Sequence, residues 1–315
     1  MIKKWVLKAI VQKTISYFPK RDLLNLWFQK NITKGVHFDS VHFDYKVRHA
    51  KDHIAFFRDN KNFSFTESTV IEIGTGWYPV IPISLFLEGF GRIVSLDLNN
   101  YLSKKTLLET LVLFIQKEKE NHLSQYINIK DDRWQVIKEI VAKKERLTLQ
   151  EMCHLLRFEF TVCDLSKPPI NIPKAEFMCS NNTFEHIHKN LMRKILVNCK
   201  SLIKAGGIMS HFIDMTDHFC HFDKSITEYN FLKYSEKRWN IIDNDIQPQN
   251  RMRLVNYKEL YKELQIPITK EVIWPSKVHL LEGFPIHDEF SKYSVKQLAI
   301  FHAYLISDIN SSNLT

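Results

Sequence analysis

Residues 69–99 read TVIEIGTGWYPVIPISLFLEGFGRIVSLDLN, and this stretch decides the fold. An apolar strand over 70–73 runs into a glycine turn, an apolar helix follows, and a second apolar strand ends in Asp97. This order predicts a βαβ unit, which binds ligands at the carboxyl ends of its strands. Gly74 and Gly76 allow a sharp turn and a close approach to a ligand. Asp97 can accept hydrogen bonds from both hydroxyls of a ribose, so the stretch predicts a site for a nucleoside-type cofactor.

The glycine turn also fits other interpretations. A dinucleotide site wants G-x-G-x-x-G at the start of a helix, but Pro79 stands where the third glycine is expected. A glycine pair after an apolar strand is also a common structural turn. The acid before the glycines, Glu72, disfavours a pyrophosphate and suits a cationic ligand. The resulting E-x-G-x-G sequence resembles motif I of the class I S-adenosylmethionine-dependent methyltransferases.

Later segments match that family in the same order. Residues 158–164 (FEFTVCD) resemble the third strand, whose terminal acid reaches the adenine amino group, and residues 175–180 (AEFMCS) resemble the fourth. The triplet Phe184-Glu185-His186 resembles the family's LEH, and residues 204–207 (KAGG) resemble its LKPGG turn, which would cap a helix over 191–203 before a strand over 208–213. The resemblance implies S-adenosylmethionine as cofactor. The implied cofactor-binding residues are Glu72, Gly74, Thr75, Gly76, Asp97, Leu98, Asp164 and Asn181.

The resemblance also implies an α/β fold: a Rossmann-like sheet of seven strands, the last antiparallel, flanked by helices. We expect a helical N-terminal extension or lid over 1–65, with residues 34–53 contributing to the lid. A methyltransferase domain would span 66–308 and carry a helical insertion over 101–157 and a substrate cap over 216–254. The final helix and strands of the sheet are expected over 256–264, 269–274 and 300–306, and residues 309–315 form a tail. The insertion is placed to shape access or to form a homodimer.

The composition is that of a soluble globular protein, with 44% hydrophobic and 25% charged residues among 315. Neither a membrane span nor a signal peptide is evident. Five cysteines without a C-x-x-C pair predict reduced thiols and a cytoplasmic location. The net charge of +9 comes from dispersed lysines, and the strand-four loop lacks the D/N-P-P-Y tetrapeptide of nucleic-acid amino methyltransferases. A nucleic-acid partner is therefore disfavoured.

Residues 1–20 alternate apolar side chains with lysines near helical spacing. One interpretation is an interfacial helix that makes peripheral contact with the inner membrane face. The other, which we favour, is a helix that packs its apolar stripe on the domain or on a partner subunit, because globular helices show the same pattern.

Candidate catalytic residues lie beyond the fifth strand, in residues 211–223 (HFIDMTDHFCHFD). Histidine titrates near neutrality and suits the removal of a proton from a hydroxyl, so His218 and His221 are the first candidates, with Asp214 and Asp217 as orienting partners. His186, after the fourth strand, is another candidate base. The alternative is that these residues have no catalytic role and only close a loop through hydrogen bonds. We predict no metal site. A divalent metal held by Asp214, Asp217 and a histidine is a weaker alternative, and a zinc site formed by His218, Cys220 and His221 is weaker again.

The cap contains aromatic residues (Tyr229, Tyr234, Trp239) that could stack on an acceptor, and two arginines (Arg251, Arg253) that could bind an anionic group. An ordinary amphipathic helix with a basic face would have the same sequence pattern. The function predicted is O-methylation of a polar small molecule or saccharide, with an anionic glycan intermediate of a cell-surface polysaccharide pathway as the first choice. Two alternatives stay open: a lipid or quinone-type methyltransferase at the membrane, and a non-catalytic partner subunit.

Overall fold

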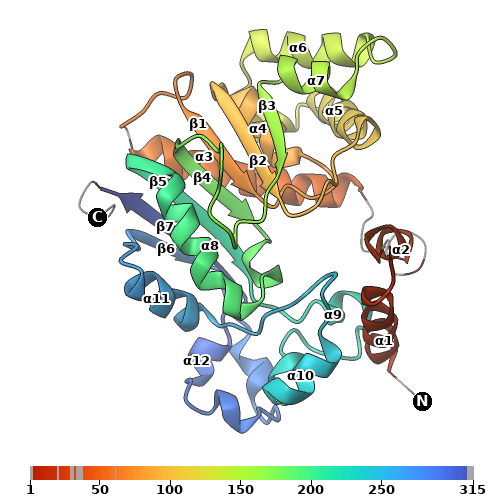
Figure 1. The fold of residues 1–315 in the computed structure, drawn as a ribbon, viewed down its shortest axis with the longest axis vertical. Coiled ribbons are helices and arrows are strands. Elements are labelled where there is room, and N and C mark those ends of the chain that lie inside the picture. The colour runs from red at the N-terminus through yellow and green to blue at the C-terminus, as the bar shows by residue number, and fades with distance from the viewer. Residues whose placement is uncertain (1–2, 20, 29–31, 33–37, 61, 311–315) are drawn as a thin grey trace.

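The computed structural model describes residues 3–19, 21–28, 32, 38–60 and 62–310. Its centre is one seven-stranded sheet in the order β3-β2-β1-β4-β5-β7-β6 (Figure 1). Only β7 runs antiparallel to its neighbours, and it lies between β5 and β6. The strands are β1 (Thr69–Ile73), β2 (Arg92–Asp97), β3 (Phe158–Val162), β4 (Ala175–Asn181), β5 (Ile203–Asp214), β6 (Lys270–Ile273) and β7 (His302–Ile309). The predicted Rossmann-like sheet with an antiparallel last strand is confirmed.

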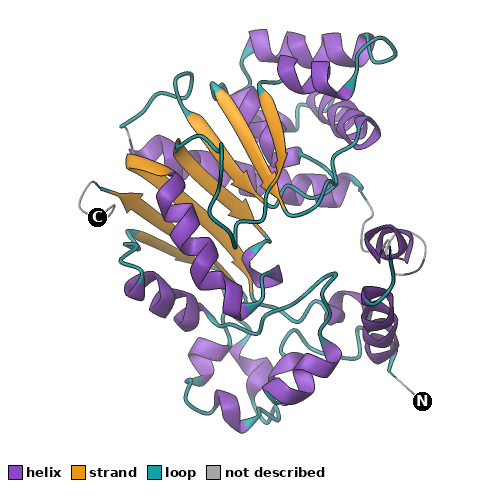
Figure 2. Ribbon diagram, viewed as in Figure 1, coloured by secondary structure: helices purple, strands orange, loops and turns teal. Residues whose placement is uncertain are grey.

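Helices cover both faces of the sheet (Figure 2). Successive side chains of a strand point to opposite faces, so Val70 and Ile71 of β1 belong to different apolar clusters. Val70 packs with helices α3 (Ser40–Asn60), α4 (Val80–Glu88) and α5 (Lys104–Lys119), and Ile71 packs with α8 (Lys189–Leu202) and α11 (Leu254–Glu263). The central strands are thus buried on both sides, which explains their continuous apolar sequence.

The turn at residues 204–207 is not a helix cap, so that prediction was wrong. Helix α8 ends at Leu202, the next residue is extended, and β5 already begins there. Gly206 has a φ of +80° inside β5, where the register against β4 shifts. A Cβ on Gly207 would lie 2.8 Å from the carbonyl oxygen of Glu176. The glycines therefore serve an irregular strand pairing rather than the end of a helix.

The insertion is helical, as predicted, and comprises α5, a short turn at Leu123–Gln125, α6 (Asp131–Ala142) and α7 (Leu149–Leu155). Its apolar side chains join the cluster of α3 and α4, beside the β3 edge of the sheet (Figure 1). Dimerisation through this insertion stays a prediction.

The segments predicted as a cap belong to an apolar cluster that extends beyond residues 216–254, and the name cap is kept for this whole cluster. The cluster contains residues of α9 (Phe219–Phe222), the turn Asn230–Lys233 and α10 (Glu236–Ile242), but also of residues 278–299, which include α12 (Val295–Leu298). Two residues of the first helix, Trp5 and Ala9, are buried in the same cluster. This third apolar cluster is difficult to recognise from the sequence, because α11 and β6 separate its segments along the chain.

The N-terminal region contains α1 (Lys4–Ser16), α2 (Arg21–Phe28) and α3. Helix α1 packs on the cap, and the Trp5 amide donates to Asp223 Oδ2 at 3.1 Å. The favoured prediction, packing of α1 on the domain, is confirmed for this face of the helix. Within the described ranges, no helix combines the length and the apolar character needed to cross a membrane. Parts of the predicted tail (311–315), lid (34–37) and N-terminal segment (1–2 and 20) lie outside the described residues.

Candidate functional site

A cavity of about 440 Å³ lies at the carboxyl ends of β1, β2 and β4. Its walls come from the glycine turn after β1, the end of β2, the loop after β3 and the loop after β4. Five of the eight predicted cofactor residues line it, namely Gly74, Gly76, Asp97, Leu98 and Asp164. The parallel strands explain this, because side chains far apart in sequence meet where neighbouring strands end.

The glycine turn is built for close approach. Gly74 and Gly76 have φ values of +81° and +69°, which side chains with a Cβ rarely adopt. A Cβ on Gly74 would overlap Thr183, whose hydroxyl donates to the carbonyl of Ile73 at 3.0 Å. A Cβ on Gly76 would meet nothing within 4 Å, because this residue borders the cavity. The first glycine thus allows two loops to pack, and the second leaves space for a ligand.

Asp97 lies at the end of β2 and is held by backbone amides. Its carboxylate accepts from the amide of Gly76 at 2.9 Å and from that of Asn99 at 3.1 Å. Burial raises the pKa of Asp97, and the amide hydrogen bonds oppose this rise. The carboxylate is therefore fixed in place and borders the cavity, as binding of a ribose requires.

Glu72 does not line the cavity, contrary to its predicted role as a cofactor ligand. Its carboxylate is buried behind the glycine turn and accepts hydrogen bonds from Thr75 Oγ1 at 2.6 Å and Ser95 Oγ at 2.9 Å. Burial raises its pKa, and the Lys46 ammonium acts against that rise. The side chain points inward because alternate residues of β1 face opposite sides of the sheet. Glu72 and the equally buried Thr75 therefore hold the turn in shape.

On the other side of the cavity, Asp164 is the predicted acid after β3. It accepts from the hydroxyl of Ser166 at 2.6 Å, which lowers its pKa. Asn181 was predicted to bind the cofactor, but it is buried and the next residue, Asn182, lines the cavity. The pleat of β4 turns the side chain of Asn181 away from the cavity, and the sequence alone did not reveal which of the two asparagines faces it.

Two aromatic residues that sequence reasoning missed also line the cavity. Trp77 follows the glycine turn and Tyr101 follows β2, and their ring centroids lie 4.3 Å apart. Both stand within four residues of a predicted ligand, so their positions beside Gly76 and Asp97 were the available signal. Among the described residues, Tyr101 is the one member of the 101–157 insertion that reaches the cavity.

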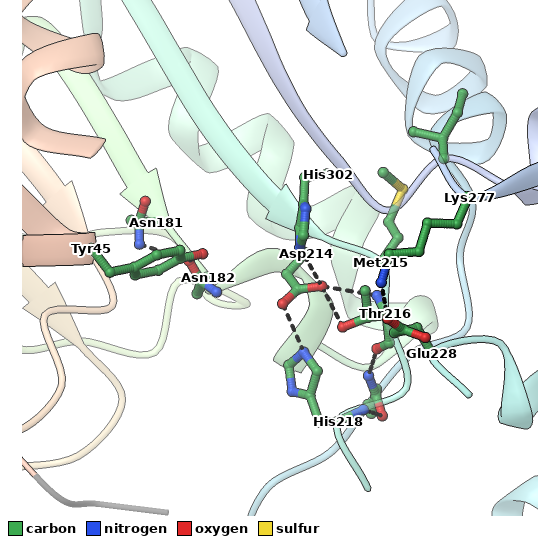
Figure 3. A network of polar contacts seen from close by, with 12 residues as sticks. Tyr45, Asn181, Asn182, Asp214, Met215, Thr216, His218, Glu228, Lys277 and His302 are labelled. Carbon is green, nitrogen blue, oxygen red and sulfur yellow. Dashed lines mark hydrogen bonds and ion pairs between the residues drawn. The ribbon is translucent and has the colours of Figure 1, made fainter. Parts of the chain in front are cut away.

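A polar cluster borders this cavity at the end of β5, centred on Asp214 (Figure 3). Asp214 Oδ1 accepts from the Thr216 hydroxyl at 2.7 Å and lies 3.3 Å from His302 Nε2 of β7, while Oδ2 lies 3.5 Å from His218 Nε2. Burial alone would raise the pKa of Asp214, but the hydrogen bonds from His218 and His302 outweigh it and hold the pKa well below its usual range. Asp214 is therefore an ionised carboxylate.

His186 connects the cluster with the cavity. It lines the cavity, and its ring centroid lies 4.9 Å from that of His218. Its Nδ1 lies 2.8 Å from the carbonyl oxygen of Pro248, and a carbonyl only accepts, so Nδ1 carries the proton and Nε2 has a free lone pair. Burial and the nearby His218 lower the pKa of His186 to about 4. The imidazole is therefore neutral near pH 7.

The two other predicted catalytic residues, His221 and Asp217, lie outside the contacts between Asp214, His218 and His186. His221 is exposed at the outer rim, with its ring centroid 5.6 Å from that of His218. Asp217 points away from the cluster into the cap, where it accepts from the Asn230 amide group at 3.1 Å and the Phe219 backbone amide at 2.9 Å. Burial raises the pKa of Asp217 to about 6. Of the two predicted orienting partners, Asp214 therefore lies beside His218, and Asp217 does not contact the histidines.

Comparison with known proteins finds similarity of fold only. No protein-family model matches the chain, and no curated protein compared with it is significantly similar. The structure is similar to a carbon methyltransferase, CurJ (11% identity, TM-score 0.43, covering 84% of this chain and 55% of that one). It is also similar to an O-methyltransferase family protein from Burkholderia thailandensis (12%, 0.40, 86% and 59%).

A third similar structure is the 1,6-didemethyltoxoflavin-N1-methyltransferase of Burkholderia thailandensis with bound S-adenosylhomocysteine (11%, 0.40, 87% and 92%). The chain spans less than two thirds of each of the first two proteins. The names of the three place the methyl group on carbon, oxygen and nitrogen respectively. The similarity therefore assigns no acceptor atom to the present chain.

The cap residues predicted to bind an acceptor are engaged elsewhere. Arg251 pairs with Glu236 and donates to the carbonyl of Phe231, and Arg253 is fully buried with its guanidinium on backbone carbonyls. Tyr229 and Trp239 are buried in the apolar cluster of the cap. The arginines therefore hold the cap together, and the prediction of an anion site on them was wrong.

Proposed function

We propose that the protein is an S-adenosylmethionine-dependent methyltransferase. The observation that carries the proposal is the single cavity in which the ends of three strands place Gly74 and Gly76, Asp97 and Asp164. The open space at Gly76 and the fixed carboxylate of Asp97 fit the methionine part and the ribose of that cofactor respectively. The cofactor supplies a methyl group that its sulfonium already activates, so the protein has to position the acceptor and exclude water.

The chain's own residues provide a place for the acceptor beside His186. The cluster there offers ionised Asp214, neutral His186 and the hydroxyl of Tyr45, which donates to Asn182 Oδ1 at 3.3 Å. These groups bind and orient hydroxyls. They support O-methylation of a polar small molecule or saccharide, and a neutral acceptor rather than an anionic one, because the carboxylates repel an anion. A role in cell-surface polysaccharide synthesis remains a prediction.

Calorimetric titration tests the cofactor directly. We expect one molecule of S-adenosylhomocysteine, the demethylated product, to bind per chain with a Kd on the order of micromolar, corresponding to about −8 kcal/mol. NAD⁺ serves as the control and should not bind, because the turn lacks the third glycine that faces a pyrophosphate. If the folded protein binds neither S-adenosylmethionine nor its product, the result would favour the alternative that the protein is a non-catalytic partner subunit.

One observation favours a second candidate, the membrane-surface methyltransferase. The face of α1 opposite the cap exposes Leu7 and Ile10 at 58% and 54%, and Leu23 of α2 is 63% exposed. Lys3 and Lys4 at the start of α1 are exposed, whereas Lys8 and Lys13 contact the cap. Basic residues beside exposed apolar side chains are typical of helices that bind an anionic lipid surface. We therefore keep peripheral membrane contact through residues 1–20 as a proposal.

The double substitution Leu7→Ser and Ile10→Ser tests this contact. We expect it to reduce co-sedimentation with phosphatidylglycerol-containing vesicles by about tenfold, because two large apolar side chains no longer enter the lipid. Val41→Ser is the matched control, since Val41 is 74% exposed on α3, away from α1. Equal sedimentation of the wild type, the double variant and the control would exclude lipid binding by this face.

A further inference from the structure

Glu185 is a buried carboxylate without a charged partner. It lies in the short turn Phe184–His186 and is only 2% exposed. Neither of its oxygens has a hydrogen-bond partner of normal geometry within the described ranges, and it forms no ion pair there. An unpaired buried carboxylate costs several kcal/mol, so proteins neutralise it or place it beside a cation.

The side chains around Glu185 are metal-ligating types. One ligand atom each of Glu185, His186 and His218 lie within 4.8 Å of one another. Asp214, His218 and His221 form a second group by the same measure, so His218 is common to both. A lysine or arginine would have been the simpler way to neutralise the two carboxylates. The structure gathers imidazoles there instead.

The hydrogen bond of His186 prepares it for coordination. Because Nδ1–H donates to the Pro248 carbonyl, Nε2 presents its lone pair. Histidine ligands in metal sites commonly donate their other N–H to a carbonyl or carboxylate in this way. The tautomer that Pro248 selects therefore leaves Nε2 of His186 available to a metal ion.

We propose that Glu185, His186 and His218 hold one divalent first-row transition-metal ion such as Mn²⁺ or Zn²⁺. Two imidazoles and a carboxylate favour these ions over Mg²⁺ or Ca²⁺, which prefer oxygen ligands. Asp214 Oδ2, 3.5 Å from His218 Nε2, lies beside the site and adds negative charge. The exposed His221 marks the side from which an ion would enter.

The position of the site gives the ion a role that rests on the proposed function. His186 borders the cofactor cavity, so the ion would lie where the acceptor hydroxyl is expected. A bound metal would lower the pKa of a coordinated hydroxyl, so that its proton could pass to bulk water without a strong protein base. The acceptor class this favours is one whose hydroxyl oxygen can coordinate the ion.

Metal binding is measured directly, independently of methyl transfer. The metal-free full-length protein is titrated with Mn²⁺ by electron paramagnetic resonance, and its melting temperature is followed with Mn²⁺ or Zn²⁺. We expect one ion per chain, a higher Tm with metal, and binding at least about tenfold weaker in Glu185→Gln and His218→Ala. Glu228→Gln, a nearby carboxylate that pairs with Lys277 outside the cluster, should bind like the wild type.

Glu185→Gln also keeps the test valid if other variants unfold. Without metal it should be at least as stable as the wild type, because it removes an uncompensated buried carboxylate, and circular dichroism checks its fold. No saturable Mn²⁺ or Zn²⁺ binding to the wild type, or equal binding by Glu185→Gln, would overturn the proposal. If the protein binds S-adenosylhomocysteine but no metal, this inference alone is refuted. If it binds metal but not S-adenosylhomocysteine, the proposed function is refuted.

Discussion

Replacing Asp97 with alanine is expected to weaken binding of S-adenosylhomocysteine by at least about 100-fold, because hydrogen bonds from two ribose hydroxyls to a carboxylate contribute about 1.5–3 kcal/mol each. The variant also frees the Gly76 amide, which the carboxylate now holds at 2.9 Å. The glycine turn thus loses an anchor at the same time as the ribose loses its acceptor. Calorimetric titration of wild type and variant at one ionic strength measures the difference.

Asp59→Ala is the control for this substitution, since Asp59 is an exposed acid at the end of α3, away from the cavity. It should bind the cofactor product like the wild type. If Asp97→Ala is folded and binds within about threefold of wild type, the assignment of Asp97 to the ribose is refuted. A variant that has lost its circular dichroism spectrum would instead reveal a structural role for the Gly76 contact.

Replacing Arg253 with methionine is expected to lower the free energy of unfolding by about 4 kcal/mol, because three buried carbonyls lose their donor at a cost of about 1–3 kcal/mol each. The guanidinium donates to the carbonyls of Met215, Leu298 and Ile300. It thereby joins the end of β5 to the loop between α12 and β7. Methionine keeps much of the apolar volume, so the loss reports mainly on the hydrogen bonds.

Urea unfolding measures this loss, with Arg238→Met as the control. Arg238 is exposed on α10, and its substitution should change the free energy of unfolding by no more than about 0.5 kcal/mol. Equal midpoints for the two variants would show that the Arg253 hydrogen bonds contribute nothing net. Burial lowers the pKa of Arg253 to about 10, so the side chain remains charged at the neutral pH of the experiment.

The sequence predicted which strand ends meet at the cavity. The glycine turn, Asp97 and Asp164 each lie at the end of a strand, and a parallel sheet brings such ends together. The direction of a side chain at a strand end was harder to predict. Glu72 and Asn181 are close to the cavity in sequence, yet the pleat of each strand turns them away from it.

The acceptor half depended on contacts that no local pattern reveals. His302 reaches Asp214 because β7 pairs with β5, and Tyr45 reaches Asn182 from α3. His186 and His218 were predicted separately, and the sheet brought them together. The prediction for the arginines of the cap was wrong because the sequence does not distinguish an arginine that faces solvent from one that donates to a buried carbonyl.

The packing of α1 against the cap bears on the order in which the molecule assembles. Gln12 of α1 donates to Gln247 at 3.1 Å, and the next residue after that, Pro248, accepts from His186. Asn25 of α2 and Gln247 both belong to the cavity wall. This wall is therefore complete only when α1 and α2 contact segments more than 200 residues later in the chain. Contacts between residues so far apart in sequence are slow to form. A ribosome-bound chain would therefore expose α1 and α2 for most of its synthesis before the segment around Gln247, and after it β6 and β7 of the sheet, are available to pack.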